Sequence, residues 1–255
     1  MASLQGKTAL VTGASRGIGR ATASALAEAG ARVLVHYGRS AQDAESLVAA
    51  IRSKGGRADA IRADLGPPDG ATRLAREVRS IVGERLDVLV SNAGISMAAT
   101  IKDHTVEDFD NLFATNVRSP FFLVQQLLPV LGEGSSIIVI SSLGAHAVVG
   151  KPGLDNPSIL AYASTKGALE TLVKNWAAIL GPHGIRVNAV APGGIDTDMS
   201  NLLKTEAGRE AVLGMQALKR VGKPEDVADV VAFLASEAAR WITGASIPVD
   251  GGSKL

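Results

Sequence analysis

Residues 8–19 read TALVTGASRGIG. The first four, Thr8 to Val11, form a short apolar run that is typical of a buried parallel strand. A glycine-rich turn follows, and Arg20 to Ala29 is predicted to be an alanine-rich helix that ends at Gly30. A phosphate-binding turn needs this order, because glycines permit a tight turn and a helix N-terminus supplies free N–H groups. An ordinary strand–turn–helix connection would look the same, but both flanks favour a nucleotide site.

The end of the next apolar run indicates which nucleotide is bound. Sites for NAD usually place a carboxylate after the second strand, where it holds the ribose 2′-hydroxyl. Here Arg32 to His36 is followed by Tyr37-Gly38-Arg39-Ser40, without a carboxylate. Arg16 and Arg39 are placed to flank a 2′-phosphate, with Ser40 as a hydrogen-bond donor. Two solvated surface arginines are the alternative, but the pattern favours NADP(H) over NAD(H).

The alternation of apolar runs and helical segments continues to the end of the chain. Seven strands are expected, at residues 8–11, 32–36, 57–63, 86–90, 136–141, 186–190 and 246–250. This alternation predicts an α/β fold, a Rossmann-like doubly wound parallel sheet with helices on both faces. No repeat or linker divides residues 1–255, so one domain is expected. The motifs that predict nucleotide binding lie in residues 1 to about 140. The residues that predict catalysis and substrate binding lie in residues from about 141 to 255.

The segment LAYASTK, residues 160–166, carries the strongest sign of chemistry. In a helix it places Tyr162 and Lys166 on one face, one turn apart. A phenol releases its proton at about pH 10, and a nearby cation favours the phenolate, so the pair suits proton transfer at a carbonyl or alcohol oxygen. Alone, such a pair is more often a solvated helix face.

Two polar residues accompany this pair. Ser142 ends the fifth strand, where a strand-end cap is the simpler interpretation. Asn116 lies just ahead of Pro120 in a long helical stretch, Thr105 to Leu131, that the proline is expected to bend or interrupt. Near such a break an asparagine binds released backbone groups or a water.

Composition excludes several classes of function. The net charge is +1, from 26 basic and 25 acidic residues, and no basic block predicts binding to nucleic acid or a membrane surface. No apolar run approaches the roughly 18 residues of a membrane span. The chain has no cysteine, and its four histidines are scattered, so no metal site is predicted. A cytoplasmic location is expected.

Five motifs in order resemble the short-chain dehydrogenase/reductase family over essentially the whole chain. They are the turn with Gly13, Gly17 and Gly19, the Asn92-Ala93-Gly94 turn, Ser142, the Tyr162/Lys166 pair and the Pro192-Gly193 segment. The resemblance implies hydride transfer between a nicotinamide cofactor and a carbonyl or alcohol carbon of a small molecule, in a homotetramer or dimer. The cofactor would transfer the hydride, and the protein would orient the cofactor and transfer the proton.

The resemblance also implies roles for individual residues. Tyr162 would protonate the carbonyl oxygen, Lys166 would hold the nicotinamide ribose, Ser142 would bind the substrate oxygen, and Asn116 would hold a relay water. The remaining cofactor contacts would come from Gly13, Ser15, Arg16, Gly17, Ile18, Gly19, Arg39, Ser40, Asp64, Leu65, Asn92, Ala93, Gly94, Pro192, Gly193, Ile195 and Thr197. Asp64 would meet the adenine, and Ile195 and Thr197 the carboxamide.

Within the family the chain is most similar to 3-oxoacyl-acyl-carrier-protein reductases. Ser142 and Tyr162 are 20 positions apart, whereas many members have 13, and the added residues fall in the loop that should border the substrate. The basic positions at which such reductases dock an acidic carrier hold Glu133 and His183. An NADPH-dependent carbonyl reductase is the leading hypothesis. An alcohol or sugar dehydrogenase and a non-catalytic NADP(H)-sensing protein are the alternatives.

Overall fold

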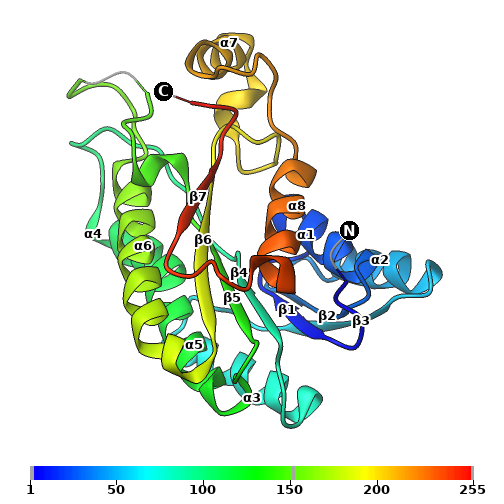
Figure 1. Cartoon of the computed structure of the whole chain (residues 1–255). Helices are drawn as coiled ribbons and strands as arrows, with labels where there is room; N and C mark the ends of the chain where they lie inside the picture. The colour runs from blue at the N-terminus through cyan, green and yellow to red at the C-terminus, as the bar shows by residue number, and fades with distance from the viewer. Residues whose placement is uncertain (1–2, 151–152, 254–255) are drawn as a thin grey trace.

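A computed structural model describes residues 3–150 and 153–253. Lys151 and Pro152, which the sequence places in the long loop before Tyr162, lie outside these residues. The seven expected strands form one parallel sheet in the order β3-β2-β1-β4-β5-β6-β7, which confirms the predicted doubly wound fold (Figure 1). The strands are β1 (Thr8–Val11), β2 (Arg32–Tyr37), β3 (Arg57–Arg62), β4 (Val88–Ser91), β5 (Ser136–Ile140), β6 (Arg186–Pro192) and β7 (Ser246–Val249).

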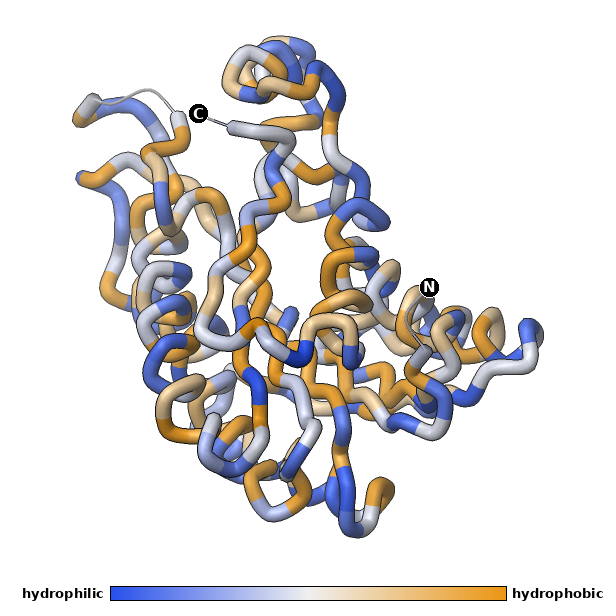
Figure 2. The backbone as a smooth tube through the Cα atoms, in the orientation of Figure 1, coloured by the Kyte–Doolittle hydropathy of each residue, from blue (hydrophilic) through white to orange (hydrophobic). Residues whose placement is uncertain are grey.

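Helices pack on both faces of this sheet. One face is covered by α1 (Gly17–Glu28), α2 (Ala41–Ser53) and α8 (Pro224–Ala235), and the other by α3 (Gly70–Val82), α5 (Ser119–Leu127) and α6 (Leu160–Leu180). Side chains of a strand alternate between the two cores, so Ala9 and Val11 enter the first core and Leu10 the second. Because both faces are covered, the central strands β1, β4 and β5 are mostly apolar (Figure 2), whereas the edge strand β3, with the sequence RADAIR, alternates between exposed and buried residues.

The long helical stretch is interrupted, as predicted. Helix α4 (Val106–Phe113) begins at a capping box of Thr105 and Asp108 and passes into a π-helical turn, η1 (Ala114–Arg118). Helix α5 follows without a gap, and Pro120, its second residue, has no N–H to donate to the preceding turn, which is the π-helical one. The segment after β6 is a 3-10 turn, η5 (Asn201–Lys204), and a helix, α7 (Glu206–Met215). Shorter turns are η2 (Leu128–Val130), η3 (Leu143–Ala145), η4 (Gly181–His183) and η6 (Glu237–Ala239).

The predicted start and end of the first helix need correction. Helix α1 begins at Gly17 rather than Arg20 and ends at Glu28 rather than Ala29, because the last two glycines of the turn already belong to the helix. Asp69 precedes α3, and its carboxylate caps no N–H. It forms an ion pair with Arg73, 2.7 Å away, so it stabilises the first turn through a side chain instead.

The strand order determines where a ligand can bind. The chain leaves β1 in one direction to build β2 and β3, and returns to the other side of β1 to build β4 onward. Between β1 and β4 the connecting segments diverge, which leaves a crevice at the carboxyl ends of the strands. The segments that follow β1, β4, β5 and β6 carry the predicted motifs, and the fold brings all four to this one edge.

Candidate active site

The glycine turn is too crowded for side chains. Gly13 has a φ of +63° and Gly17 a φ of +54°, in the left-handed region that favours glycine. A Cβ on Gly19 would overlap the Gly13 carbonyl oxygen. No side chain caps the first turn of α1, which starts directly behind this turn. The turn therefore offers backbone N–H groups and close access, which fits the pyrophosphate of a dinucleotide.

Asn92, in the turn after β4, hydrogen-bonds the backbone at the start of the glycine turn. Its Nδ2 donates to the carbonyl oxygens of Thr12 and Gly13, at 2.8 and 3.1 Å. The Thr12 hydroxyl in turn accepts from the backbone N–H groups of Asn92 and Ala93, at 2.9 and 3.0 Å. Asn92 thus joins β1 to β4. Thr12 is a partner that the sequence analysis missed, since a threonine after a strand carries no distinctive signal.

His36 is a second missed residue and lies buried at the end of β2. Its Nδ1 accepts from the Gly13 N–H at 3.1 Å, so the 3.0 Å contact of Nε2 with the Ala63 carbonyl oxygen requires a proton on Nε2. The ring is therefore neutral and in one tautomer. Burial lowers the pKa of His36 from 6.5 to about 4, although the bond to Ala63 opposes the shift. The sequence analysis assigned His36 only to the strand.

The predicted 2′-phosphate residues lie close to this turn. Arg16 and Arg39 are exposed, and Ser40 is partly buried and caps no N–H of α2. Arg16 lies 3.9 Å from Asp198, a long and solvated ion pair. Within the described part of the chain the Arg39 guanidinium has no ion-pair partner. Both guanidinium groups are therefore available to an anionic ligand.

Tyr162 and Lys166 share one face of α6, as predicted. The Lys166 amine lies 5.4 Å from the centre of the Tyr162 ring. The amine is buried and donates a 2.7 Å hydrogen bond to the Ile140 carbonyl oxygen at the end of β5. Strand β5 thus fixes the lysine beside the tyrosine. Burial lowers the pKa of Lys166 from 10.5 to about 8.

The expected direction of the tyrosine pKa is wrong for this structure. Burial raises the pKa of Tyr162 above its ordinary value of 10.0, and a hydrogen bond with Ser142 only partly opposes the shift. The expectation rested on the charge of Lys166, whereas burial also desolvates the phenol, which penalises a phenolate. Tyr162 therefore holds its proton at neutral pH.

Ser142 lies where β5 ends and caps the 3-10 turn η3. Its Oγ accepts from the Gly144 N–H at 3.1 Å, as the simpler interpretation predicted, and it also hydrogen-bonds Tyr162. Ser142 is therefore both the cap of η3 and a hydrogen-bond partner of Tyr162.

Asn116 lies in the π-helical turn and is 1% exposed. Its Oδ1 accepts from the Ile95 N–H at 2.9 Å, and its Nδ2 donates to the Ile95 carbonyl oxygen at 2.9 Å and to Thr165 Oγ1 at 3.1 Å. The sequence predicted bonds to backbone groups released by the helix break, but the backbone groups that Asn116 binds belong to Ile95, in the segment after β4. These bonds tie the turn after β4 to α6 just before Lys166.

The other predicted residues lie in the segments that follow β3 and β6. A Cβ on Gly17 would lie 3.3 Å from Thr197 Cγ2, so the segment after β6 touches the glycine turn. Ile195 is buried, and the Gly193 N–H donates to Val249. Asp64 is exposed, and its Oδ1 accepts from the Gly66 N–H at 3.0 Å, so it caps its own turn, while Leu65 is buried.

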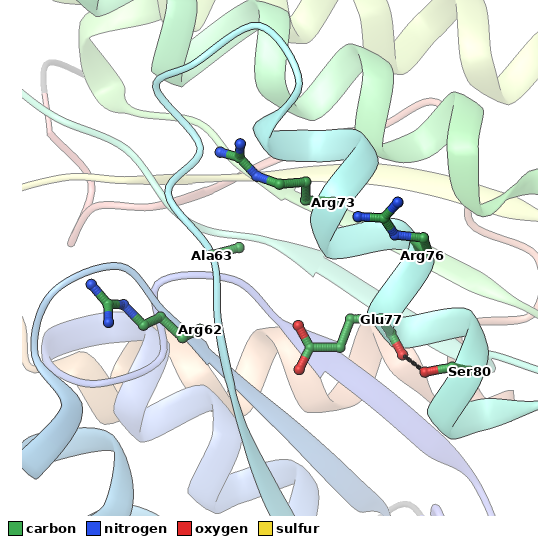
Figure 3. Close-up of a pocket in the computed structure, with 6 residues that line it drawn as sticks. All are labelled: Arg62, Ala63, Arg73, Arg76, Glu77 and Ser80. Atoms are coloured by element: carbon green, nitrogen blue, oxygen red, sulfur yellow. Dashed lines mark hydrogen bonds between the residues drawn. The ribbon is translucent and has the colours of Figure 1, made fainter.

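Two surface cavities lie away from Tyr162. One, of about 380 Å³, lies between the end of β3 and helix α3 (Figure 3). Its lining residues are Arg62, Ala63, Arg73, Arg76, Glu77 and Ser80. The other, of about 500 Å³, lies between α1, α8 and the segment around Thr197. Neither contains a reacting group of the crevice.

Among residues 3–150 and 153–253, no three side chains of His, Asp or Glu gather where they could hold a metal ion. In the same ranges, no helix combines the length and the apolar character needed to cross a membrane.

Known proteins resemble this chain over its whole length. The sequence profile described as enoyl-(acyl carrier protein) reductase matches residues 13–254. Versicolorin reductase stcU of Emericella nidulans is 43% identical over 98% of this chain and 96% of its own. Tetrahydroxynaphthalene reductase of Pyricularia oryzae is 39% identical over 99% of this chain and 91% of its own.

A solved structure resembles the fold equally well. The angucycline C-6 ketoreductase LanV with bound NADP superimposes with a TM-score of 0.91, at 43% identity, over 100% of this chain and 98% of its own. The predicted motifs occur in the expected order, and they follow the carboxyl ends of β1, β4, β5 and β6 at one edge of the sheet. The chain belongs to the short-chain dehydrogenase/reductase family and is an oxidoreductase.

Proposed function

We propose that the protein is an NADPH-dependent reductase of bulky, apolar aromatic ketones. The observation that carries the proposal is the Tyr162 phenol, hydrogen-bonded to Ser142 and next to the buried amine of Lys166, at the crevice that the glycine turn opens. Relatives named for versicolorin, tetrahydroxynaphthalene and an angucycline C-6 ketone support this substrate class.

The residues in the crevice suit carbonyl reduction. NADPH, when bound, supplies the hydride. Tyr162 keeps its proton at neutral pH, so it donates that proton to the carbonyl oxygen as a general acid. The Ser142 hydroxyl hydrogen-bonds the same carbonyl oxygen and stabilises the charge that develops there. Lys166, buried beside the ring, stabilises the phenolate that remains.

NADP(H) is proposed over NAD(H). The end of β2 carries Arg39 and Ser40 instead of a carboxylate, and Arg16 lies in the neighbouring turn. A guanidinium group binds a 2′-phosphate through charge-assisted hydrogen bonds, which a ribose hydroxyl does not match. The glycine turn and the uncapped start of α1 would hold the pyrophosphate.

A bulky apolar substrate is supported by the segments beyond the carboxyl edge of the sheet. The loop before α6 and the η5 segment both project there (Figure 1). They carry large apolar side chains that are exposed, namely Val148 at 68%, Leu154 at 63%, Met199 at 51% and Leu202 at 47%. Such side chains lower their exposure by covering an apolar ring system.

A homo-oligomer, a tetramer or a dimer, is also proposed, with a cytoplasmic location. Helices α4, α5 and α6 leave large apolar side chains exposed, and Trp241 is 96% exposed. The exposed large apolar residues on these helices are Val106, Phe109, Phe121, Phe122, Leu160 and Ile179. Burying these groups between copies of the chain would stabilise an assembly. Light scattering on the purified protein measures its mass, and a 26.2 kDa particle would contradict the proposal.

A substrate screen tests the proposed function. NADPH and NADH are each supplied with polycyclic aromatic ketones, β-keto esters and simple ketones, and nicotinamide absorbance is followed. Turnover of the polycyclic ketones with NADPH is expected. Tight NADPH binding without turnover of any substrate in either direction would favour a sensing protein instead.

A further inference from the structure

Glu170, one turn after Lys166 on α6, lies at the centre of a polar cluster below the reacting groups. Its side chain is 12% exposed. Its Oε1 accepts from the hydroxyls of Ser141 at 2.7 Å and Ser246 at 2.9 Å, and lies 2.8 Å from Nε2 of His146. One carboxylate thus connects α6 to the end of β5, to the segment after η3 and to the start of β7.

Glu170 contacts residues on both sides of Ser142 in the chain. Ser141 directly precedes Ser142, and His146 follows η3, so Glu170 holds both ends of residues 141–146. Tyr162 lies two turns before Glu170 on the same helix. Ser142 and Tyr162 are therefore linked through residues 141–146, the Glu170 carboxylate and helix α6.

We propose that Glu170 is a positioning residue that sets the Ser142 hydroxyl at hydrogen-bond distance from the Tyr162 phenol. The inference rests on the role proposed above for Ser142. A carboxylate that accepts two hydroxyl hydrogen bonds holds its partners more firmly than neutral groups do. Hydrogen bonding to the substrate oxygen depends steeply on donor placement, and an error of about 1 Å costs about 100-fold in rate. A residue that never touches the substrate can thereby control the rate.

The cluster also assigns a role to His146. Its Nε2 lies 2.8 Å from Glu170 Oε1 and 3.5 Å from the Ser246 hydroxyl. His146 therefore anchors the far end of the segment that carries Ser142. It is half-exposed, so its ring closes the cluster toward solvent.

The first experiment compares three variants in single-turnover oxidation of NADPH, with a ketone that the wild-type protein reduces in the substrate screen. Glu170→Ala should slow the hydride-transfer step about 10- to 100-fold while leaving NADPH affinity unchanged. Glu170→Gln keeps an acceptor oxygen for both serine hydroxyls and should restore most of the rate. Lys174→Ala, an exposed change one turn further on α6, is the matched control and should have no effect.

A double-mutant cycle with Ser142→Ala separates positioning from general damage. If Glu170 acts through Ser142, adding Glu170→Ala to Ser142→Ala should change the rate by less than about twofold. Additive losses in the two variants would overturn the proposal, as would a Glu170→Ala variant with the wild-type rate.

A crystal structure of Glu170→Ala decides the same point without any turnover. The Ser142 hydroxyl should move out of hydrogen-bond distance of Tyr162, whereas an unchanged Ser142–Tyr162 contact would refute the positioning role. A wild-type protein that reduces no ketone would contradict the proposed function, and the crystallographic result on Glu170 would still stand by itself.

Discussion

The amine of Lys166 lies 5.4 Å from the centre of the Tyr162 ring and 2.7 Å from the Ile140 carbonyl oxygen. Helix α6 brings the two side chains together, but the strand carbonyl determines where the amine stays. Burial acts on both groups in the direction of the neutral form, because it raises the pKa of Tyr162 and lowers that of Lys166 to about 8. The site therefore starts its reaction with a protonated phenol, as reduction of a ketone requires.

Replacing Tyr162 with Phe should remove the proton donor and leave the cofactor site intact. We expect kcat to fall at least about 100-fold, because a positioned general acid contributes 100-fold or more. The Kd for NADPH, measured by nicotinamide fluorescence, should stay unchanged. The chain has only two tyrosines, and Tyr37→Phe is the matched control that should keep kcat. Retained turnover in Tyr162→Phe would refute the role of the phenol.

Replacing Arg39 with Ala should weaken NADPH binding selectively. Hydrogen bonds to a charged group contribute about 1.5–3 kcal/mol, so the Kd for NADPH should rise about 10- to 100-fold while that for NADH barely changes. Arg62→Ala, on the neighbouring strand β3, removes an equally exposed guanidinium outside the predicted site. Equal weakening of both nucleotides by Arg39→Ala would contradict 2′-phosphate recognition.

His36 should make stability depend on pH between 6.5 and about 4. The folded protein keeps this ring neutral down to about pH 4, whereas the unfolded chain binds a proton from pH 6.5 downward. The unfolded state thus binds more protons in this window, and the free energy of unfolding falls as pH falls, by about 3 kcal/mol at the lower end.

Urea unfolding of the wild type and of His36→Asn at several pH values measures this effect. The variant should be less stable at pH 7.5 by about 1–3 kcal/mol, since Gly13 N–H or Ala63 C=O loses its partner. Its stability should also fall less steeply with pH than that of the wild type. His183→Asn, at an exposed position, serves as the control. Parallel pH profiles for His36→Asn and wild type would show that His36 is not the titrating group.

A methyl group at Gly19 should disrupt the cofactor turn. The added Cβ of Gly19→Ala would overlap the Gly13 carbonyl oxygen and lie 2.5 Å from Asn92 Nδ2. The Asn92 side chain and the glycine turn must therefore shift. We expect a loss of about 1–3 kcal/mol in stability and at least about tenfold weaker NADPH binding. Gly214→Ala in α7 meets nothing within 4 Å and should bind NADPH normally. Thermal unfolding and cofactor titration of the two variants provide the comparison.

The sequence by itself determined the elements and the local pairings. Seven apolar runs predicted the seven strands, and helical spacing placed Tyr162 and Lys166 on one face. Ser142 also formed the predicted strand-end cap, with the Gly144 N–H as its donor. These features depend on neighbours within a few residues, whose geometry the backbone fixes.

Only the tertiary structure decided which distant groups hold the site and in which protonation state. His36 reaches Gly13 and Ala63, and Glu170 reaches Ser246, across 23 to 76 positions of the chain. The pKa of Tyr162 moved against the expectation because desolvation depends on what covers a group. Residue types and spacing describe contacts along the chain, whereas burial and long-range contacts exist only once the sheet has brought its carboxyl ends together.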